Sequence, residues 1–313
     1  RPAGDKSWPV ACSGTALGGA DKELDLSGAH LSYGDFKEAT FTGMGAIRLN
    51  GAGLAHADLS GSNFSAVGGE AQTIDAIVDF RAANLTNANL RASRLTSKSS
   101  TKGNATIDFT EADLAHADLS GSTLTAKSAF GGDEISATVD FSGANLADAN
   151  LSGSMFTAEN SYGGASTVVF SGANLAHTDL SDSSFTADSS QSSYGESIID
   201  FSKANLANAD LRDSRFIAET SYGASTIDFS ETDFTNADLS GSKLTAEGKA
   251  GDATINFTKS NLANADLSGS KFTVNSNLGY ATIDFTEANL TNTNLSGSRF
   301  TAKAVYGLPT PPA

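Results

Sequence analysis

The side chains best suited to chemistry in this sequence are its many carboxylates, four histidines and a single cysteine. Imidazole and carboxylate groups bind Zn²⁺ and act as general acids and bases. His56, His116 and His177 are 60 and 61 positions apart. Cys12 is the only cysteine, so neither an internal disulfide nor a cysteine metal cluster can form. The GxSxG, HExxH and P-loop motifs are absent, so these residues carry no recognisable enzyme signature.

The placement of the polar residues is set by a repeat of large apolar residues. Residues 200–218, 228–246 and 284–302 each carry Leu or Phe at every fifth position, and ten such quartets can be followed from Leu26 to Phe300. A period of five fits neither a helix face, which repeats every 3.6 residues, nor a strand face, which repeats every 2. The chain must therefore turn every five residues, as in a square coil whose sides each point one apolar residue, here called a centre, inwards.

The residues between the centres suit such turns. The residue two before a centre is usually Ala, which can point inwards without crowding the axis, and Asn or Asp often follows it. Asn, Asp, Ser and Gly form turns through side-chain hydrogen bonds to the backbone and through tolerance of positive φ. Hydrophobic residues make up only 39% of the chain, and the net charge is −16. This composition can indicate disorder, but the regular spacing of the centres argues against it.

Three-residue units of Ala, then Asp or Asn, then Leu occur at 112–114, 204–206 and 209–211. They resemble the A(D/N)LXX signature of the pentapeptide-repeat family, and the resemblance extends from about Leu26 to Phe300. It implies an all-β, right-handed quadrilateral β-helix with four five-residue sides per coil. We therefore expect a solenoid of about ten coils, which at ~4.8 Å per coil is a rod on the order of 45–50 Å long.

Most coils depart from the plain repeat through an insertion at one corner. Phe216 and Phe229, the fourth centre of one coil and the first of the next, are thirteen positions apart instead of five. Several insertions contain Ser-Tyr-Gly, echoed at Phe130 and Tyr306, and return through an alternating segment typical of a strand. We expect the insertions to stack into a ridge or flattened wing. Inserted residues often form the binding face of a solenoid, but an aromatic column can also bury the base of its own ridge. The tyrosines concerned are Tyr162, Tyr194 and Tyr222.

Stacking also predicts charged columns on either side of this corner. The position before the first centre is acidic in several coils, and the position before the fourth centre is basic in several. These columns form either a solvated charge pattern or a polarised docking face. Two threonine columns, represented by Thr106 and Thr125, resemble the flat faces of ice-binding solenoids, although β-propensity explains them equally well. The charged candidates for an interaction surface are Asp200, Asp228, Asp284, Arg215, Lys243, Lys271 and Arg299.

Three of the four histidines, His56, His116 and His177, share one position, the second residue after the second centre, and are about two coils apart, whereas His30 is isolated. We interpret them as polar corner residues rather than as a metal or catalytic site, and we expect no enzyme activity, no metal and no cofactor. The acidic net charge disfavours nonspecific nucleic-acid binding and docking to anionic membranes. No apolar run reaches the ~18 residues of a membrane helix, so we expect no membrane insertion.

The expected domain boundaries are an N-terminal cap at 1–22, the β-helix at 23–302 and a proline-rich tail at 303–313. The first residue is Arg1 rather than Met, which indicates either an internal segment or a processed protein that is exported or lumenal, whether extracellular, periplasmic or in the thylakoid lumen.

The predicted function is a structural or scaffold protein that binds a protein partner, or a second copy, along the solenoid surface. The resemblance supplies an alternative, an acidic mimic of DNA that binds an enzyme such as a topoisomerase. An ice- or surface-binding solenoid is a further alternative.

Overall fold

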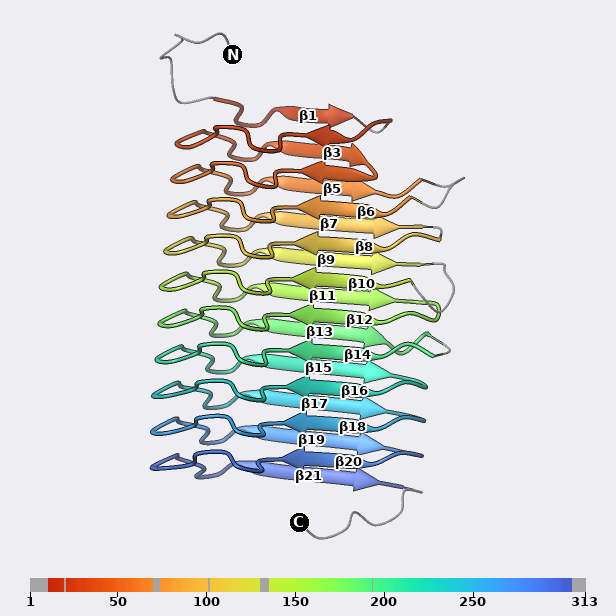
Figure 1. The fold of residues 1–313 in the computed structure, drawn as a ribbon, viewed down its shortest axis with the longest axis vertical. Coiled ribbons are helices and arrows are strands. Elements are labelled where there is room, and N and C mark those ends of the chain that lie inside the picture. The colour runs from red at the N-terminus through yellow and green to blue at the C-terminus, as the bar shows by residue number, and fades with distance from the viewer. Residues whose placement is uncertain are drawn as a thin grey trace.

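Two parallel sheets run the length of the molecule, and successive turns of the chain add strands to them in alternation (Figure 1). The strand order is β1-β3-β5 through to β21 in the first sheet and β2-β4-β6 through to β20 in the second. The computed structural model describes residues 11–19, 21–69, 74–100, 102–129, 135–192 and 194–305. No helix in these ranges is long and apolar enough to span a bilayer.

The strands of the first sheet are β1 (Ala16–Gly19), β3 (Thr40–Met44), β5 (Asn63–Val67), β7 (Arg94–Ser99), β9 (Thr123–Ser128), β11 (Met155–Asn160), β13 (Ser184–Ser189), β15 (Arg215–Thr220), β17 (Lys243–Gly248), β19 (Lys271–Ser276) and β21 (Arg299–Ala304). Those of the second sheet are β2 (Leu24–Asp25), β4 (Ala46–Arg48), β6 (Ala76–Asp79), β8 (Ala105–Asp108), β10 (Ala137–Asp140), β12 (Ser166–Val169), β14 (Ser197–Asp200), β16 (Ser225–Asp228), β18 (Ala253–Asn256) and β20 (Ala281–Asp284).

The register of the sheets places each centre above its equivalent in the preceding coil. In the first sheet Phe156 pairs with Leu124 on one side and with Phe185 on the other. The two remaining sides of each coil are joined by single bridges, such as Asp113 to Asn145 and Asp118 to Asn150. Each complete coil thus has four sides, and the predicted quadrilateral β-helix is confirmed.

The centres fill the axis of the rod. Leu206, Leu211 and Phe216 are fully buried, as are the equivalent residues of the other inner coils. The Phe rings at the first centre stack in a column, so that Phe170 lies parallel to Phe141 and Phe201 with 4.7 Å between ring centroids in each case. Offset or edge-to-face aromatic pairs add about 0.5–1.5 kcal/mol beyond area burial. The core is therefore a set of continuous side-chain columns rather than a globular cluster.

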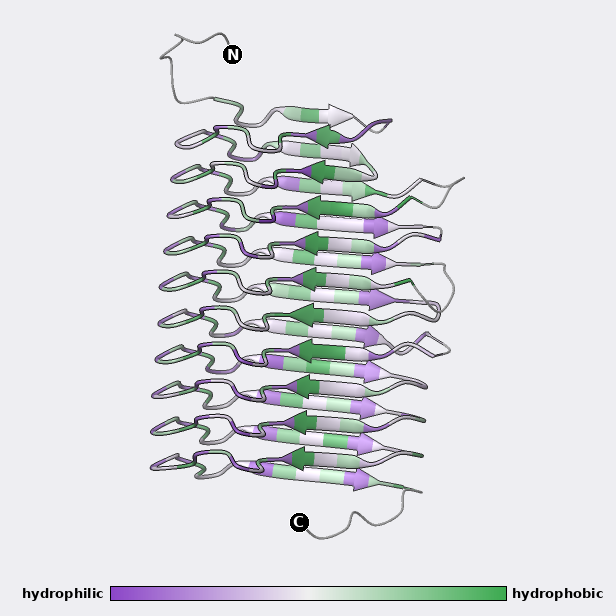
Figure 2. Ribbon diagram, viewed as in Figure 1, coloured by the Kyte–Doolittle hydropathy of each residue, from purple (hydrophilic) through white to green (hydrophobic). Residues whose placement is uncertain are grey.

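The insertions form a flattened wing, because much of their length continues the strands of the two sheets. A strand of the first sheet runs outwards past the fourth centre, and the next strand of the second sheet returns in the opposite direction (Figure 1). Alternate residues face the space between the sheets, with Ala126 and Ser128 on β9 opposite Ala137 and Val139 on β10. The returning strands carry strongly hydrophobic segments (Figure 2). The wing predicted from the insertions is therefore present, as a thin two-layer sandwich lined by small side chains.

The corners of the coil require the left-handed backbone conformation two residues after a centre. Non-glycine residues there have φ between 51° and 60°, as in Ala82 and Ala92, and glycine occupies equivalent positions such as Gly121 and Gly153. His56, His116 and His177 also lie at these corners, with φ of 57–58°.

Replacing Ala92 with glycine should stabilise the protein. The left-handed conformation costs an L-residue about 1–2 kcal/mol, whereas added freedom in the unfolded chain costs glycine about 0.4–1 kcal/mol. We expect Ala92→Gly to raise the free energy of unfolding by about 0.5–1 kcal/mol, measured by urea unfolding followed by circular dichroism. Gly121→Ala is the matched reverse change, because its added Cβ would meet no atom within 4 Å. A loss of stability in Ala92→Gly would contradict the prediction.

The ladder of described strands extends beyond residues 23–302 at both ends of the rod. At the N-terminus, Leu17 on β1 pairs with Phe41, so the ladder begins inside residues 1–22. At the C-terminus, β21 extends to Ala304. Trp8 of the expected cap and the prolines at 309, 311 and 312 lie outside the described residues.

Candidate interaction surface

The aspartates of the predicted acidic column hold the turns at one corner of the coil through hydrogen bonds. The Oδ1 atoms of Asp200, Asp228 and Asp284 each accept a hydrogen bond at 2.8 Å from the backbone N–H two residues later. The pKa of Asp284 is lowered from its ordinary value, mainly by its hydrogen bonds with Thr286. Because a carboxylate is a better acceptor than a carboxylic acid, these aspartates fix the turns in their charged form.

The predicted basic column lies on the other sheet. Arg215, Lys243, Lys271 and Arg299 are exposed and follow one another in register at the start of β15, β17, β19 and β21. Among the described residues, no ion pair joins them to Asp200, Asp228 or Asp284. The structure therefore does not bring the two predicted columns together.

A different acidic column shares the face of the basic residues. Asp188, Glu219 and Glu247 stack in register on the outer face of the first sheet, near the end of the strands. The pKa of Glu219 is raised, first by burial and then by the charges of Glu247 and Asp188, while Arg215 and Lys249 act in the opposite direction. This column was not predicted from the sequence, although each member stands three positions after a fourth centre.

Replacing Glu219 with glutamine should stabilise the protein most at neutral pH. A carboxyl group whose pKa is raised on folding binds its proton more readily in the folded state, so its destabilising effect is present when it is ionised and fades as pH falls. Asn275 is a natural neutral residue in this column. We expect a gain of at most about 1 kcal/mol, because the group is partly solvated. Urea unfolding at neutral and acidic pH measures the difference in free energy of unfolding between Glu219→Gln and the natural protein. The same difference at both pH values would contradict the prediction.

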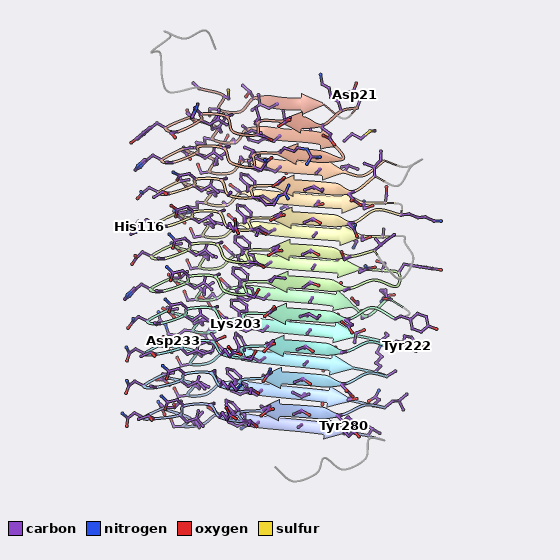
Figure 3. The ribbon with its side chains drawn as sticks, in the orientation of Figure 1. Asp21, His116, Lys203, Tyr222, Asp233 and Tyr280 are labelled. Atoms are coloured by element: carbon purple, nitrogen blue, oxygen red, sulfur yellow. The ribbon has the colours of Figure 1, made fainter. Side chains whose placement is uncertain are left out.

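The tyrosines of the insertions form an exposed ridge at the tip of the wing. Tyr162 is 59% exposed, Tyr194 72% and Tyr222 59%. The rings of Tyr194 and Tyr222 are 6.4 Å apart and inclined at 42°. Figure 3 shows Tyr222 at the wing tip and His116 at the opposite edge of the rod. The structure therefore brings the predicted tyrosines to one edge, here called the tyrosine ridge.

The ridge continues into a later coil that the sequence analysis missed. Leu278 is 61% exposed and Tyr280 44% exposed, and Figure 3 places Tyr280 on the same edge as Tyr222. These residues lack the Ser-Tyr-Gly pattern, but they follow a fourth centre at a similar distance. The echoes at Phe130 and Tyr306 lie outside the described residues.

The histidines at the corners of the coil do not form a shared site. His56 stacks on Tyr33 with 4.7 Å between ring centroids, and His116 Nδ1 lies 3.9 Å from an Asp148 carboxylate oxygen. In the described part of the chain, no group of three or more His, Cys, Asp or Glu side chains is arranged to hold a metal.

The threonine columns lie on opposite faces of the wing. Thr106 is on β8 of the second sheet and Thr125 on β9 of the first. Each face carries a single file of threonines beside charged columns, as in Lys243, Thr245 and Glu247 on β17. Neither face therefore presents adjacent threonine files.

This geometry defines the class of the protein as a quadrilateral β-helix that carries a two-layer wing. The family model for pentapeptide repeats matches eight copies, at residues 107–125, 139–158, 226–246 and 283–302. The chain therefore contains pentapeptide repeats. No curated protein matches the sequence significantly.

Several solved structures align along most of the chain. HetL, a pentapeptide-repeat protein involved in heterocyst differentiation regulation in the cyanobacterium Nostoc, is 21% identical, with a TM-score of 0.22 over 93% of this chain and 89% of its own. QnrB1, a plasmid-mediated fluoroquinolone resistance protein, is 14% identical, with a TM-score of 0.24 over 93% of each chain. Rfr23 from the cyanobacterium Cyanothece is 18% identical, with a TM-score of 0.15 over 62% of this chain and 90% of its own. At these scores the alignments carry no functional argument.

Proposed function

We propose that the protein is a non-enzymatic scaffold that holds a protein partner along the outer edge of its wing. The observation that carries this proposal is the tyrosine ridge, where Tyr194 and Tyr222 stand on successive coils and expose most of their surface. Tyrosine supplies a large contact area at low cost in side-chain entropy and is enriched at protein interfaces.

The polar residues at the corners support this choice of edge. On the three sides without the wing, Asp and Asn side chains accept hydrogen bonds from their own turns, as Asp113 does from Ala115 and Asp118 from Ser120. Their hydrogen-bonding capacity is used to hold the coil. The rings of Tyr194 and Tyr222 at the wing tip are mostly exposed to solvent.

The test is a cross-linking experiment in cells of the native source. A photoreactive residue is placed beside the ridge, and captured proteins are identified by mass spectrometry in natural and Tyr194→Ser/Tyr222→Ser backgrounds. Tyr33→Asn is the matched control, since Tyr33 is 63% exposed at the opposite corner and its position is occupied by asparagine in other coils. We expect one partner to be lost only from the ridge variant. Capture that is unaffected by the ridge variant, or lost equally from the control, would argue against the proposal.

Self-association is a second candidate function, favoured by the C-terminal end of the rod. There, Ile283, Phe285, Leu290, Leu295 and Phe300 line an open apolar hollow of about 310 Å³. Leu290, Leu295 and Phe300 are 39–44% exposed, whereas the equivalent centres of inner coils are fully buried. The N–H groups of Phe285, Leu290 and Leu295 have no partner among the described residues, which contain no further coil beyond them. An open strand edge of this kind pairs readily with another chain.

A second copy docked on this end should be detectable by analytical ultracentrifugation. Leu295→Lys places a charge in the hollow and should abolish association. Met155→Lys is the control, because Met155 is 49% exposed on the outer face of β11, in the column of Lys243. A natural protein that remains monomeric at high concentration would exclude this candidate.

The acidic charge also leaves DNA mimicry to be tested as a function. A DNA mimic should inhibit supercoiling by gyrase at stoichiometric amounts, whereas a scaffold should not. We prefer the scaffold, because the exposed basic column on the first sheet interrupts the negative charge that a DNA mimic would need.

A further inference from the structure

The tyrosine ridge is bordered by negative charge on both of its sides. On the first-sheet side lie Asp188, Glu219 and Glu247, which stack in register. On the second-sheet side, Glu196 and Asp252 are exposed just before β14 and β18. The cations that act on Glu219 are Arg215 and Lys249, and both lower its pKa. The edge of the wing is therefore an aromatic strip between two acidic borders.

The spacing of the tyrosine rings matches an extended peptide. The ring centroids of Tyr194 and Tyr222 are 6.4 Å apart. An extended chain advances about 3.3 Å per residue, so alternate side chains on one face are about 6.6 Å apart. A peptide lying along the rod axis can thus place every second side chain over successive rings.

The chemistry of the strip selects the side chains of that peptide. An Arg or Lys cation over the face of a tyrosine ring is attracted by the electrons of the ring. The same cation can reach a carboxylate at the border, which relieves the like-charge repulsion within the acidic column. Arginine suits both contacts best, because its planar guanidinium stacks on rings and binds carboxylates in pairs of hydrogen bonds.

We propose that the tyrosine ridge binds an extended basic segment of a partner protein, with Arg or Lys at alternate positions lying over Tyr194 and Tyr222 and between the acidic borders. This proposal rests on the proposed scaffold function and specifies the chemistry of its partner. The segment binds through its side chains, and a segment with Glu in place of Arg or Lys is repelled by the acidic borders.

The test uses three fluorescent twelve-residue peptides and purified protein, with affinity measured by fluorescence anisotropy. One peptide alternates Arg and Ser, one alternates Glu and Ser, and one carries the same six arginines in a block. We expect saturable binding of the alternating arginine peptide, weaker binding of the block peptide, and none of the glutamate peptide. Because the contacts are electrostatic, added salt should weaken the affinity.

Protein variants separate the ridge from the acidic surface as a whole. Tyr194→Ser/Tyr222→Ser should weaken binding of the alternating peptide about tenfold, and Glu219→Gln/Glu247→Gln should weaken it and reduce its salt dependence. Tyr33→Asn should bind as the natural protein does. The tyrosines are exposed, so thermal unfolding of the two tyrosine variants should be unchanged. The Glu219→Gln/Glu247→Gln variant should unfold at the same temperature as the natural protein or higher, and both results show that the variants are folded.

Several results would overturn the proposal. These are an absence of saturable binding, equal affinity in the tyrosine variant, and equal or tighter binding of the block peptide. The scaffold function would still hold if cross-linking captured a ridge-dependent partner. The segment of that partner in contact with the ridge would then lack alternating basic residues. Loss of ridge-dependent capture, with peptide binding intact, would contradict the scaffold function instead.

Discussion

Replacing Phe170 with alanine is expected to lower the free energy of unfolding by about 3–5 kcal/mol. Phe170 is fully buried, stacks between Phe141 and Phe201, and meets Phe156 and Phe185 edge to face at 5.4 and 5.7 Å. Alanine removes all of these contacts and leaves a cavity in the middle of the column. The parallel ladders above and below restrict collapse into that space, because each coil is held by hydrogen bonds to both neighbours.

Urea unfolding followed by circular dichroism measures this loss. Phe170→Leu is the matched control, since leucine occupies the first centre in other coils, as at Leu26 and Leu49. It should cost clearly less than alanine. Hydrogen exchange should show the largest loss of protection in the coils on either side of residue 170, because repeat proteins are stabilised by neighbouring units. A loss below about 1 kcal/mol in the alanine variant would contradict the proposed packing.

Replacing Gly251 with alanine is expected to destabilise the wing tip by about 1–3 kcal/mol. A Cβ at this position would lie 2.0 Å from the Gly223 carbonyl oxygen and 2.5 Å from its carbon. Gly195 and Gly223 are equally crowded by the coil before them, with Cβ positions 2.1 and 2.4 Å from a carbonyl oxygen. These glycines let the tips of successive coils stack at the spacing of the ladder.

Limited proteolysis at the tip and urea unfolding both measure the effect of Gly251→Ala. Ala250→Ser is a control at the neighbouring position, which contacts solvent. The control should behave as the natural protein does, whereas Gly251→Ala should be cleaved faster at the tip. Unchanged cleavage and stability would show that the tips can separate without cost. The separation of the tyrosine rings depends on this stacking, so Gly251→Ala should also weaken binding of the alternating arginine peptide.

The fold was predictable because the five-residue period leaves few ways to bury Leu206, Leu211 and Phe216 together. The wing was predictable for a similar reason, since alternation around Ile227 is typical of a strand. Side-chain partners were harder to assign. A sequence shows that Asp200 and Arg215 recur in columns, but not that the aspartate turns back to the Ser202 N–H while Arg215 points outwards from the other sheet.

The inner serines illustrate a second limit of the sequence analysis. Ser154 and Ser183 stand two residues before the fourth centre of their coils, where the repeat usually has alanine. Their hydroxyls donate hydrogen bonds of 2.7 Å to the carbonyls of Leu119 and Leu151 in the preceding coil. Nothing in the five-residue pattern specifies these bonds between coils. The candidate tyrosines were found because they repeat, whereas Leu278 and Tyr280 were missed because their coil varies the motif.

Within the described ranges, the strands of each coil pair only with those of the coil before and the coil after it, as the order of the two sheets shows. A force applied along the rod therefore acts on every contact between neighbouring coils, and the weakest of these contacts sets the force at which the molecule unfolds. A terminal coil has one neighbour instead of two and should unravel first under tension or heat, with loss spreading inwards step by step. Length can then be changed by adding or deleting a whole coil from the middle without redesigning the rest.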